Sequence, residues 1–442
     1  MVRDNGAAGR GNSLFLAGAA VIVVLILGYY LLVWGSFSQF LSAIDVWNEP
    51  FADFQRYYCP IGEAVLSGAG PVEGFVYSPF VALIMAPFAL LGCETAVFVW
   101  GALMVAGIIT YIWLFRRLVP AGLPFQWLFV ALLLLSFPLL HTFKFGQVTL
   151  FSTIALLAAL VFVGQGRKGA GAACLALAAC FKWHPAAFVA PFAARRDLRF
   201  LIWTALAGVI LLLLAPVMVL GFARTAEFYR ALWLSYKDFD WVLTSYNTQY
   251  FPNVVLRLVA ALGIRVHPLT APRLLIVLRG LAWCAVIANL TLVYLIQRRR
   301  LVRADLWSFH VLFLNIPFLL GTSWPVDLVF LPFAQTLLAW ALLDANGLPS
   351  EGGEAPAPEA QRPGWRALGP KRAVAAGLLV LVSILLSNVV LFNIIGDREV
   401  YGSLGLVFWA DALCLIVTYI LLLPQVLRGR GRPGWRTATP GI

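Results

Sequence analysis

Charged residues are scarce in this chain. Only 12% of its 442 residues are Asp, Glu, Lys or Arg, and 62% are hydrophobic, whereas soluble domains have about 25% and about 45–50%. A soluble fold cannot bury that much apolar surface, so lipid must surround most of it. The composition therefore excludes a soluble enzyme, a disordered chain and a small disulfide-stapled secreted module. Because helices satisfy their own backbone hydrogen bonds in lipid, we predict an all-α polytopic membrane protein.

Cysteines are also few, and the six present do not have the spacing of a metal site. Only Cys59 and Cys93 fall on the face that the charge pattern below places outside the cytoplasm. A disulfide between these two is one alternative, and two free thiols are the other. No internal repeat is evident in the sequence, which counts against the transporter folds that are built from repeats.

Apolar runs of about 20 residues, long enough to cross a bilayer as helices, recur along the chain. The first follows Arg3 and Arg10 and is predicted to be a retained signal anchor, because no small-residue cleavage site follows it. The stretch 345–372 is rich in Pro, Gly, Glu and Ala and is predicted to be a cytoplasmic linker. It separates a module over 1–344 from a helix pair and basic tail over 373–442. The ten predicted spans are 14–34, 94–115, 124–141, 147–165, 200–220, 273–297, 305–321, 327–344, 373–395 and 404–424.

The formal charge of +12 lies in short clusters near the ends of these spans. Lys and Arg stay cytoplasmic near span ends, and a cytoplasmic N-terminus places every cluster on that side. The charge therefore encodes topology, and we predict no nucleic-acid partner. We expect a multi-pass protein of the cytoplasmic (inner) membrane with both termini in the cytoplasm. Its outer face then carries two long segments, 35–93 and 221–272, with amphipathic helices predicted over 53–67 and 225–239.

Residues 170–194 do not fit a single crossing, because basic clusters flank both of their ends. The middle of this stretch is Lys-Trp-His-Pro at 182–185, which combines charge with a helix breaker. We therefore expect a re-entrant hairpin or a pair of short helices, with 182–185 at the outer tip. Ionisable groups at membrane depth are costly and functional by default, so this tip is a candidate site.

Several short sequences over 1–340 follow one another in a recognisable order and spacing. They are Asp53-Phe-Gln-Arg-Tyr-Tyr58, Ala64-Val-Leu-Ser-Gly68, Val76-Tyr-Ser-Pro79, Gly146-Gln147, Lys182-Trp-His-Pro185 with Arg195-Arg196, Asn247-Thr-Gln249, and Ser323-Trp324 before Asp327. As an ordered set they resemble the polyprenol-phosphate-mannose-dependent α-mannosyltransferases, which are membrane glycosyltransferases of the GT-C fold. The resemblance implies a GT-C-like catalytic module over 1–344 that moves a hexose, mannose by resemblance, from a polyprenyl-phosphate donor to a lipid- or glycan-linked acceptor at the outer face.

The resemblance places the catalytic aspartate at Asp53. A carboxylate there can accept the proton of the acceptor hydroxyl as that oxygen attacks the anomeric carbon with inversion; a helix-terminal Asp that complements the dipole is the alternative. Lys182, His184 and Lys144 are candidate ligands of the donor phosphate. A compact ammonium suits a phosphate, and the departing phosphate needs its charge stabilised. The alternative for Lys182 is a side chain that extends to the membrane interface.

Five further residues are candidates for sugar or acceptor binding. Asn247 and Gln249 can hydrogen-bond to hydroxyls, and Tyr57 and Tyr77 can stack on sugar faces, although an interfacial aromatic belt is the alternative for both tyrosines. Asp327 occupies a region where many members of the family carry histidines. It can bind sugar hydroxyls, act as a second base or cap a helix, and the sequence leaves these three alternatives open.

No cofactor is predicted. Asp45, Glu49 and Asp53 are close in sequence and suggest a divalent cation, but Pro50 interrupts any single helix through them, and a metal is not favoured. The rival function is a transporter or flippase for a polar lipid or solute, which would also use intramembrane Lys and His. A non-catalytic partner in polysaccharide synthesis is a third alternative. The long outer segment 35–93, with its acid-rich start, favours an enzyme whose partners are the lipid donor, the acceptor and membrane lipids.

Overall fold

The computed structural model describes residues 51–119, 121–237, 242, 245–263, 272–343 and 370–428. Within these ranges the chain forms helices and no strand, and two residues, Ser136 and Asn388, form an isolated bridge. The predicted all-α membrane architecture is confirmed. The first predicted span, the two acids at 45 and 49, and almost all of the predicted linker lie outside the described residues.

The helices differ widely in length, and several are interrupted by short 3₁₀ or π-helical turns. In the first half of the chain they are η1 (Phe54–Tyr58), α3 (Cys59–Ser67), α4 (Pro79–Ala89), α5 (Cys93–Leu118), α6 (Leu123–Leu134), α7 (Phe137–Phe145), α8 (Thr149–Gly164), α9 (Lys168–Phe181), η2 (His184–Val189), α10 (Ala190–Ala194), α11 (Leu198–Val209), η3 (Ile210–Leu214), α12 (Ala215–Leu220) and α13 (Phe222–Lys237). Both predicted amphipathic helices are present, as η1 with α3 and as α13.

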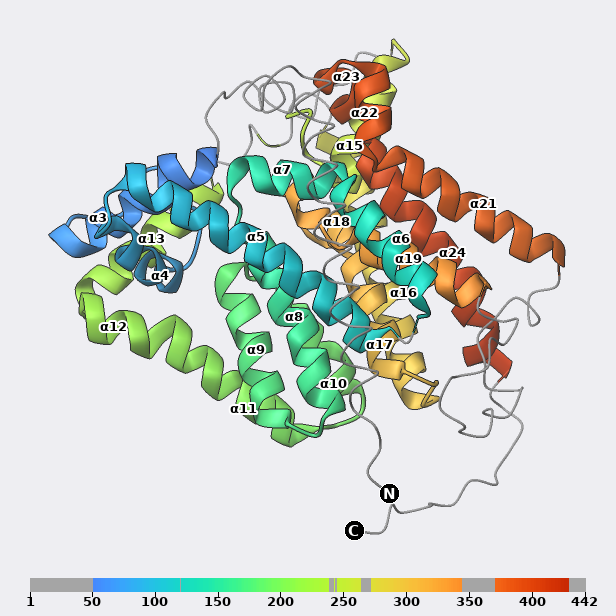
Figure 1. The fold of residues 1–442 in the computed structure, drawn as a ribbon, viewed down its shortest axis with the longest axis horizontal. Helices are drawn as coiled ribbons and strands as arrows, with labels where there is room; N and C mark the ends of the chain where they lie inside the picture. The colour runs from blue at the N-terminus through green and yellow to red at the C-terminus, as the bar shows by residue number, and fades with distance from the viewer. Residues whose placement is uncertain are drawn as a thin grey trace.

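The second half of the described chain continues in the same manner. Its helices are α15 (Phe251–Ala261), α16 (Pro272–Arg298), α17 (Ala304–Leu314), α18 (Ile316–Leu319), η4 (Pro325–Leu328), α19 (Leu331–Leu343), α21 (Pro370–Leu386), α22 (Val389–Ile395), α23 (Arg398–Ser403) and α24 (Leu406–Arg428). Figure 1 shows α3, α4 and α13 gathered at one end of the longest axis and α21 and α24 at the other.

Fewer described helices can cross a membrane than the ten spans that we expected. Five are long and apolar enough, and a sixth crossing results if the bent pair of α7 and α8 counts as one span. The expected single helices over 124–141, 305–321 and 373–395 are each divided in two. Pro138 and Pro317 lie in the first turn of the helix that follows each of the first two breaks, because proline has no N–H to donate and is tolerated in a first turn but not in a helix interior. At the third break the Asn388 side chain accepts a hydrogen bond from the Val390 amide and begins a new helix.

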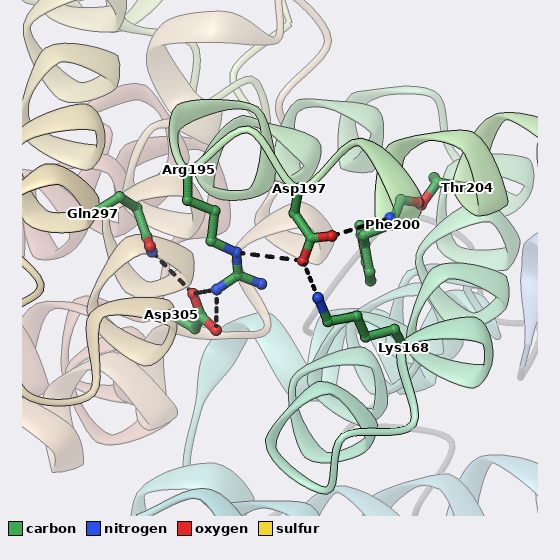
Figure 2. Close-up of polar contacts among 7 residues, drawn as sticks. All are labelled: Lys168, Arg195, Asp197, Phe200, Thr204, Gln297 and Asp305. Atoms are coloured by element: carbon green, nitrogen blue, oxygen red, sulfur yellow. Dashed lines mark hydrogen bonds and ion pairs between the residues drawn. The ribbon is translucent and has the colours of Figure 1, made fainter. Parts of the chain in front are cut away.

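The expected hairpin over 170–194 is confirmed. The 14 residues of α9 rise about 21 Å, and the six residues of η2 and five of α10 return over about 20 Å. Because the two arms match, the ends of the hairpin meet: the Lys168 ammonium lies 2.7 Å from the Asp197 carboxylate (Figure 2). Arg195 donates two hydrogen bonds to Asp305, at 2.7 and 2.8 Å, and this ties the hairpin to the start of α17.

Helix α5 carries different chemistry at its two ends. Its 26 residues span about 39 Å, enough to cross a bilayer. Cys93 begins the helix and forms a disulfide with Cys59 of α3, with the two Cα atoms 5.7 Å apart. Of the two alternatives for these cysteines, the disulfide is therefore the one formed. Arg116 and Arg117 lie in the last turn, at the opposite end.

A sharp bend between α7 and α8 places the residues that follow Gly146. The two helices meet at 119°. Gly146 ends α7 with φ +66°, a left-handed conformation that favours glycine. A Cβ atom there would lie 2.9 Å from both Phe51 Cβ and Trp100 Nε1, and the Trp100 indole donates a hydrogen bond to the Gly146 carbonyl at 2.9 Å. The bend is therefore closely packed on the side of α5, and it sets the position of Gln147.

Candidate active site

A cavity of about 700 Å³ lies where η1, the loop before α4, the α7–α8 bend, the tip of the hairpin, α13 and the segment 320–327 meet. These six elements are spread along the chain, so only the tertiary fold brings them together. The cavity combines apolar walls with a small set of ionisable groups, which is typical of a substrate site. Its ionisable lining residues other than tyrosine and cysteine are Asp53, Glu73, His141, Lys182, His184 and Asp327.

The cavity brings together six of the nine residues that the sequence proposed for the site. Asp53, Tyr57, Tyr77, Lys182, His184 and Asp327 all line it. Two features stand out among them: the Asp53 carboxylate, and the ion pair formed by Lys182 and Asp327.

Asp53 is oriented by a hydrogen-bond network. The Gln147 side-chain amide donates through Nε2 to Asp53 Oδ2. The Gln147 oxygen accepts hydrogen bonds from the Tyr77 hydroxyl at 2.8 Å and from the Tyr58 hydroxyl at 3.2 Å. The two hydroxyls hold the oxygen end of the Gln147 amide, so its nitrogen is fixed as well. The Asp53 carboxylate that accepts from this nitrogen therefore has little freedom to rotate.

Lys182 and Asp327 form a mostly buried ion pair across 145 positions of sequence. Lys182 Nζ lies 2.5 Å from Asp327 Oδ1, and the side chains are 16% and 1% exposed. Asp327 Oδ2 accepts a hydrogen bond from the Trp324 amide at 3.1 Å. Of the three alternatives for Asp327, the helix cap is present, and pairing with Lys182 is a contact that the sequence did not suggest. The α9 helix ends at Phe181, and extended backbone at Lys182 turns its side chain into the cavity.

Three predicted site residues do not line the cavity. Lys144 is fully buried in α7. The Gln249 side-chain oxygen accepts a hydrogen bond from the Phe408 amide at 3.0 Å, and the backbone amide of Gln249 donates to the Ser323 carbonyl at 2.6 Å. Gln249 thus connects the 320–327 segment with α24, a structural contact rather than an approach to substrate. Asn247 belongs to the same turn, where its backbone amide donates to Ser245 Oγ at 3.3 Å.

The loop before α4 carries Tyr77 into the cavity wall. Ser78 Oγ donates to the Cys180 carbonyl at 2.6 Å and so holds this loop against the end of α9. Gly74 has φ +81°, and a Cβ atom there would lie 2.6 Å from the Tyr57 ring. Burial, and then the negative charge of Asp53, raise the pKa of Tyr77 well above its ordinary value. Tyr77 therefore remains a neutral hydrogen-bond donor at neutral pH.

Two histidines complete the polar lining. His141 is 1% exposed, and neither of its ring nitrogens has a hydrogen-bond partner among the described residues. The same holds for Nδ1 of His184, which is 5% exposed. Buried imidazoles that face a cavity are well placed to bond to polar groups of a substrate.

Gln147 is the functional candidate that we did not identify from the sequence. The dipeptide Gly146-Gln147 is one of the matching sequences, but nothing in it indicates that the amide faces Asp53. The available signal was modest: a polar amide that follows a glycine and opens the apolar run 147–165.

Comparison with known proteins supports one family. The sequence profile of glycosyltransferase family 87 matches residues 75–323, which is more than half of the chain. The matched region includes Tyr77, Gln147 and Lys182, whereas Asp53 precedes it and Asp327 follows it. No curated protein and no solved structure matches the chain.

Proposed function

The chain belongs to glycosyltransferase family 87, and we propose that it transfers a hexose from a polyprenyl-phosphate donor to a lipid- or glycan-linked acceptor. We propose mannose as the hexose, on the resemblance noted above. The observation that carries this proposal is that one cavity holds both the oriented carboxylate of Asp53 and the ammonium of Lys182. The first group suits a base for a hydroxyl, and the second suits a phosphate leaving group.

Asp53 is the proposed catalytic base. The acceptor oxygen attacks the anomeric carbon, its proton passes to the Asp53 carboxylate, and the new oxygen–carbon bond forms on the face opposite the leaving group. The bond between the anomeric carbon and the phosphate oxygen breaks, and its electron pair leaves with the polyprenyl phosphate. A β-linked donor therefore gives an α-linked product.

Lys182 is the proposed ligand of the donor phosphate. An ammonium has three N–H donors, and the contact with Asp327 uses one of them. The remaining donors can bond to phosphate oxygens, whose negative charge grows as the sugar departs. His184 lies two residues further on the same hairpin tip and is a second proposed ligand.

The walls of the cavity support a lipid-linked donor. Leu212, Leu232 and Phe181 form an apolar side between the hairpin and the α11–α13 segment. Further along α12, Met218 and Val219 are 76% and 65% exposed, as expected for side chains in contact with lipid. A polyprenyl chain has the chemistry to lie along this surface, whereas a nucleotide does not.

The disulfide supports an outward-facing site. Disulfides persist in oxidising compartments, and the one between Cys59 and Cys93 begins six residues after Asp53 in sequence. The opposite end of α5 carries Arg116 and Arg117, as a cytoplasmic end should. We therefore propose that the cavity opens at the outer face of a cytoplasmic membrane.

The donor class can be tested with purified protein. We expect transfer from synthetic β-linked polyprenyl-phosphate mannose to suitable acceptors, an α-linked product by NMR, and no transfer from a nucleoside-diphosphate mannose. The Asp53→Asn variant, prepared in the same way, is the negative control because it lacks the proposed base. Transfer from the nucleotide sugar alone, or from none of a panel of lipid-phosphate sugars, would contradict the proposed function.

The orientation can be tested by labelling in intact cells. In a background without the two free cysteines that are not buried, Cys174 and Cys284, single cysteines are introduced as Ser67→Cys and Arg167→Cys. Both positions are exposed, and they lie on the disulfide side and the basic side respectively. We expect a membrane-impermeant maleimide to label position 67 in intact cells, and position 167 only after the cells are opened. The reverse pattern would place the cavity in the cytoplasm.

A further inference from the structure

The hydrogen bonds of Gln147 are arranged so that its amide can present only one end to Asp53. Its oxygen accepts from two hydroxyls, those of Tyr77 at 2.8 Å and Tyr58 at 3.2 Å, and its nitrogen donates to Asp53 Oδ2. If the amide were turned over, its oxygen would face the Asp53 carboxylate, and two acceptors would oppose each other. The carboxylate, which can only accept, therefore selects this orientation, and the two tyrosine hydroxyls stabilise it by donating to the Gln147 oxygen.

The surroundings make this arrangement rigid. Tyr58 is fully buried and Gln147 is 8% exposed, so water does not compete strongly for either side chain. The backbone of Gln147 is placed by the 119° bend at Gly146, where Phe51 and Trp100 leave no room for a side chain. Because hydrogen bonds in buried networks strengthen one another, the amide is a fixed donor.

We propose that Gln147 is a positioning residue for catalysis: its side-chain amide, locked by Tyr58 and Tyr77, holds the Asp53 carboxylate in its charged form and in one orientation. This inference rests on the proposed role of Asp53 as base. A donor to the charged form stabilises that form relative to the protonated one. A base must be unprotonated and must point at the hydroxyl that it deprotonates, so Gln147 serves both requirements without touching the substrate's reacting atoms.

Other ionisable groups share the cavity and belong in any account of its pH dependence. The carboxylates of Glu73 and Asp327 oppose the negative charge of Asp53, and the Lys182 ammonium favours it. The titratable and charged groups that lie near Asp53 or line the same cavity are Arg56, Tyr57, Tyr58, Glu73, Tyr77, His141, Cys180, Lys182, His184, Tyr229, Tyr236 and Asp327. All of these groups remain when only Gln147 is changed. A shift of the pH–rate profile in a Gln147 variant therefore measures the effect of the Gln147 amide on Asp53.

The test compares Gln147→Met, which keeps the length of the side chain but has no donor, with Gln147→Glu, which places a second carboxyl against Asp53. In Gln147→Met we expect kcat to fall about tenfold to a hundredfold with the KM for the donor nearly unchanged, and the acidic limb of the pH–rate profile to move up by about one pH unit. In Gln147→Glu two carboxyls share one site, and we expect a larger upward shift.

A second readout does not depend on activity. The infrared band of the protonated Asp53 carboxyl, identified by its loss in Asp53→Asn, should appear at higher pH in Gln147→Met than in the wild type. If both variants fold, as judged by thermal unfolding, and neither the band nor the profile moves, Gln147 is a packing residue and the inference is wrong. If the wild type transfers no sugar but the band moves as expected, the positioning contact stands and the proposed function fails.

Discussion

Replacing Asp53 with Asn is expected to lower the rate of sugar transfer by about 10²–10⁴-fold, the usual contribution of a general base. The amide keeps the size of the side chain but cannot accept the proton of the acceptor hydroxyl. The hydrogen bond from Gln147 Nε2 to Asp53 Oδ2 can still be made to the amide oxygen of Asn. We therefore expect the variant to fold normally and to retain binding of the donor, so that the loss falls on kcat.

The matched control is Glu94→Gln, which removes a carboxylate from an exposed position in the first turn of α5. We expect wild-type transfer from this variant. Measurement of initial rates and donor affinity in parallel for the two variants separates loss of a base from loss of surface charge. If Asp53→Asn retained more than about a tenth of the wild-type kcat, Asp53 would not be the base.

The second large effect is expected at the buried ion pair. Lys182→Met leaves the Asp327 carboxylate, 1% exposed, without its cation. Removing one partner of a buried pair destabilises a protein by about 3–5 kcal/mol, so we expect a lower unfolding temperature. We also expect the KM for the polyprenyl-phosphate donor to rise and kcat to fall, with a loss of at least about a hundredfold in kcat/KM, because the leaving phosphate loses its cation.

The double variant Lys182→Met with Asp327→Asn separates the two effects. It removes the uncompensated charge, so stability should recover towards that of the wild type, while transfer should remain as low as in the single variant. Lys168→Met is the control, because it breaks the ion pair with Asp197 at the other end of the same hairpin. Recovery of transfer in the double variant would show that Lys182 has only a structural role.

Much of the architecture was predictable because it depends on local sequence. The apolar runs, the basic clusters and the Lys-Trp-His-Pro break at 182–185 predicted helices in lipid and a hairpin whose ends return together, and the Lys168–Asp197 contact agrees. The number of spans was less predictable. Prolines at 138 and 317 divide apolar runs that have the length of a single helix, and an apolar run by itself does not show where a helix breaks.

The site was predictable only in part, because residue type suggests chemistry but not contacts. Asp53 and Lys182, which were proposed for one site because ionisable groups in an apolar chain are few, line the same cavity. Gln249 was assigned to sugar binding because amides suit hydroxyls, yet its side chain bonds to the Phe408 amide. Lys144 is buried rather than at the cavity. The contact of Gln249 depends on a partner that is distant in sequence.

The sequence by itself determined that this chain lies in a membrane, because a composition of 62% hydrophobic and 12% charged residues leaves few other environments. It also supplied the basic clusters on which the proposed orientation depends. Only the tertiary structure decided which polar groups meet. Gln147 bonds to Asp53 across 94 positions, and Lys182 pairs with Asp327 across 145. Such contacts follow from the packing of whole helices, and no local pattern of residues specifies them.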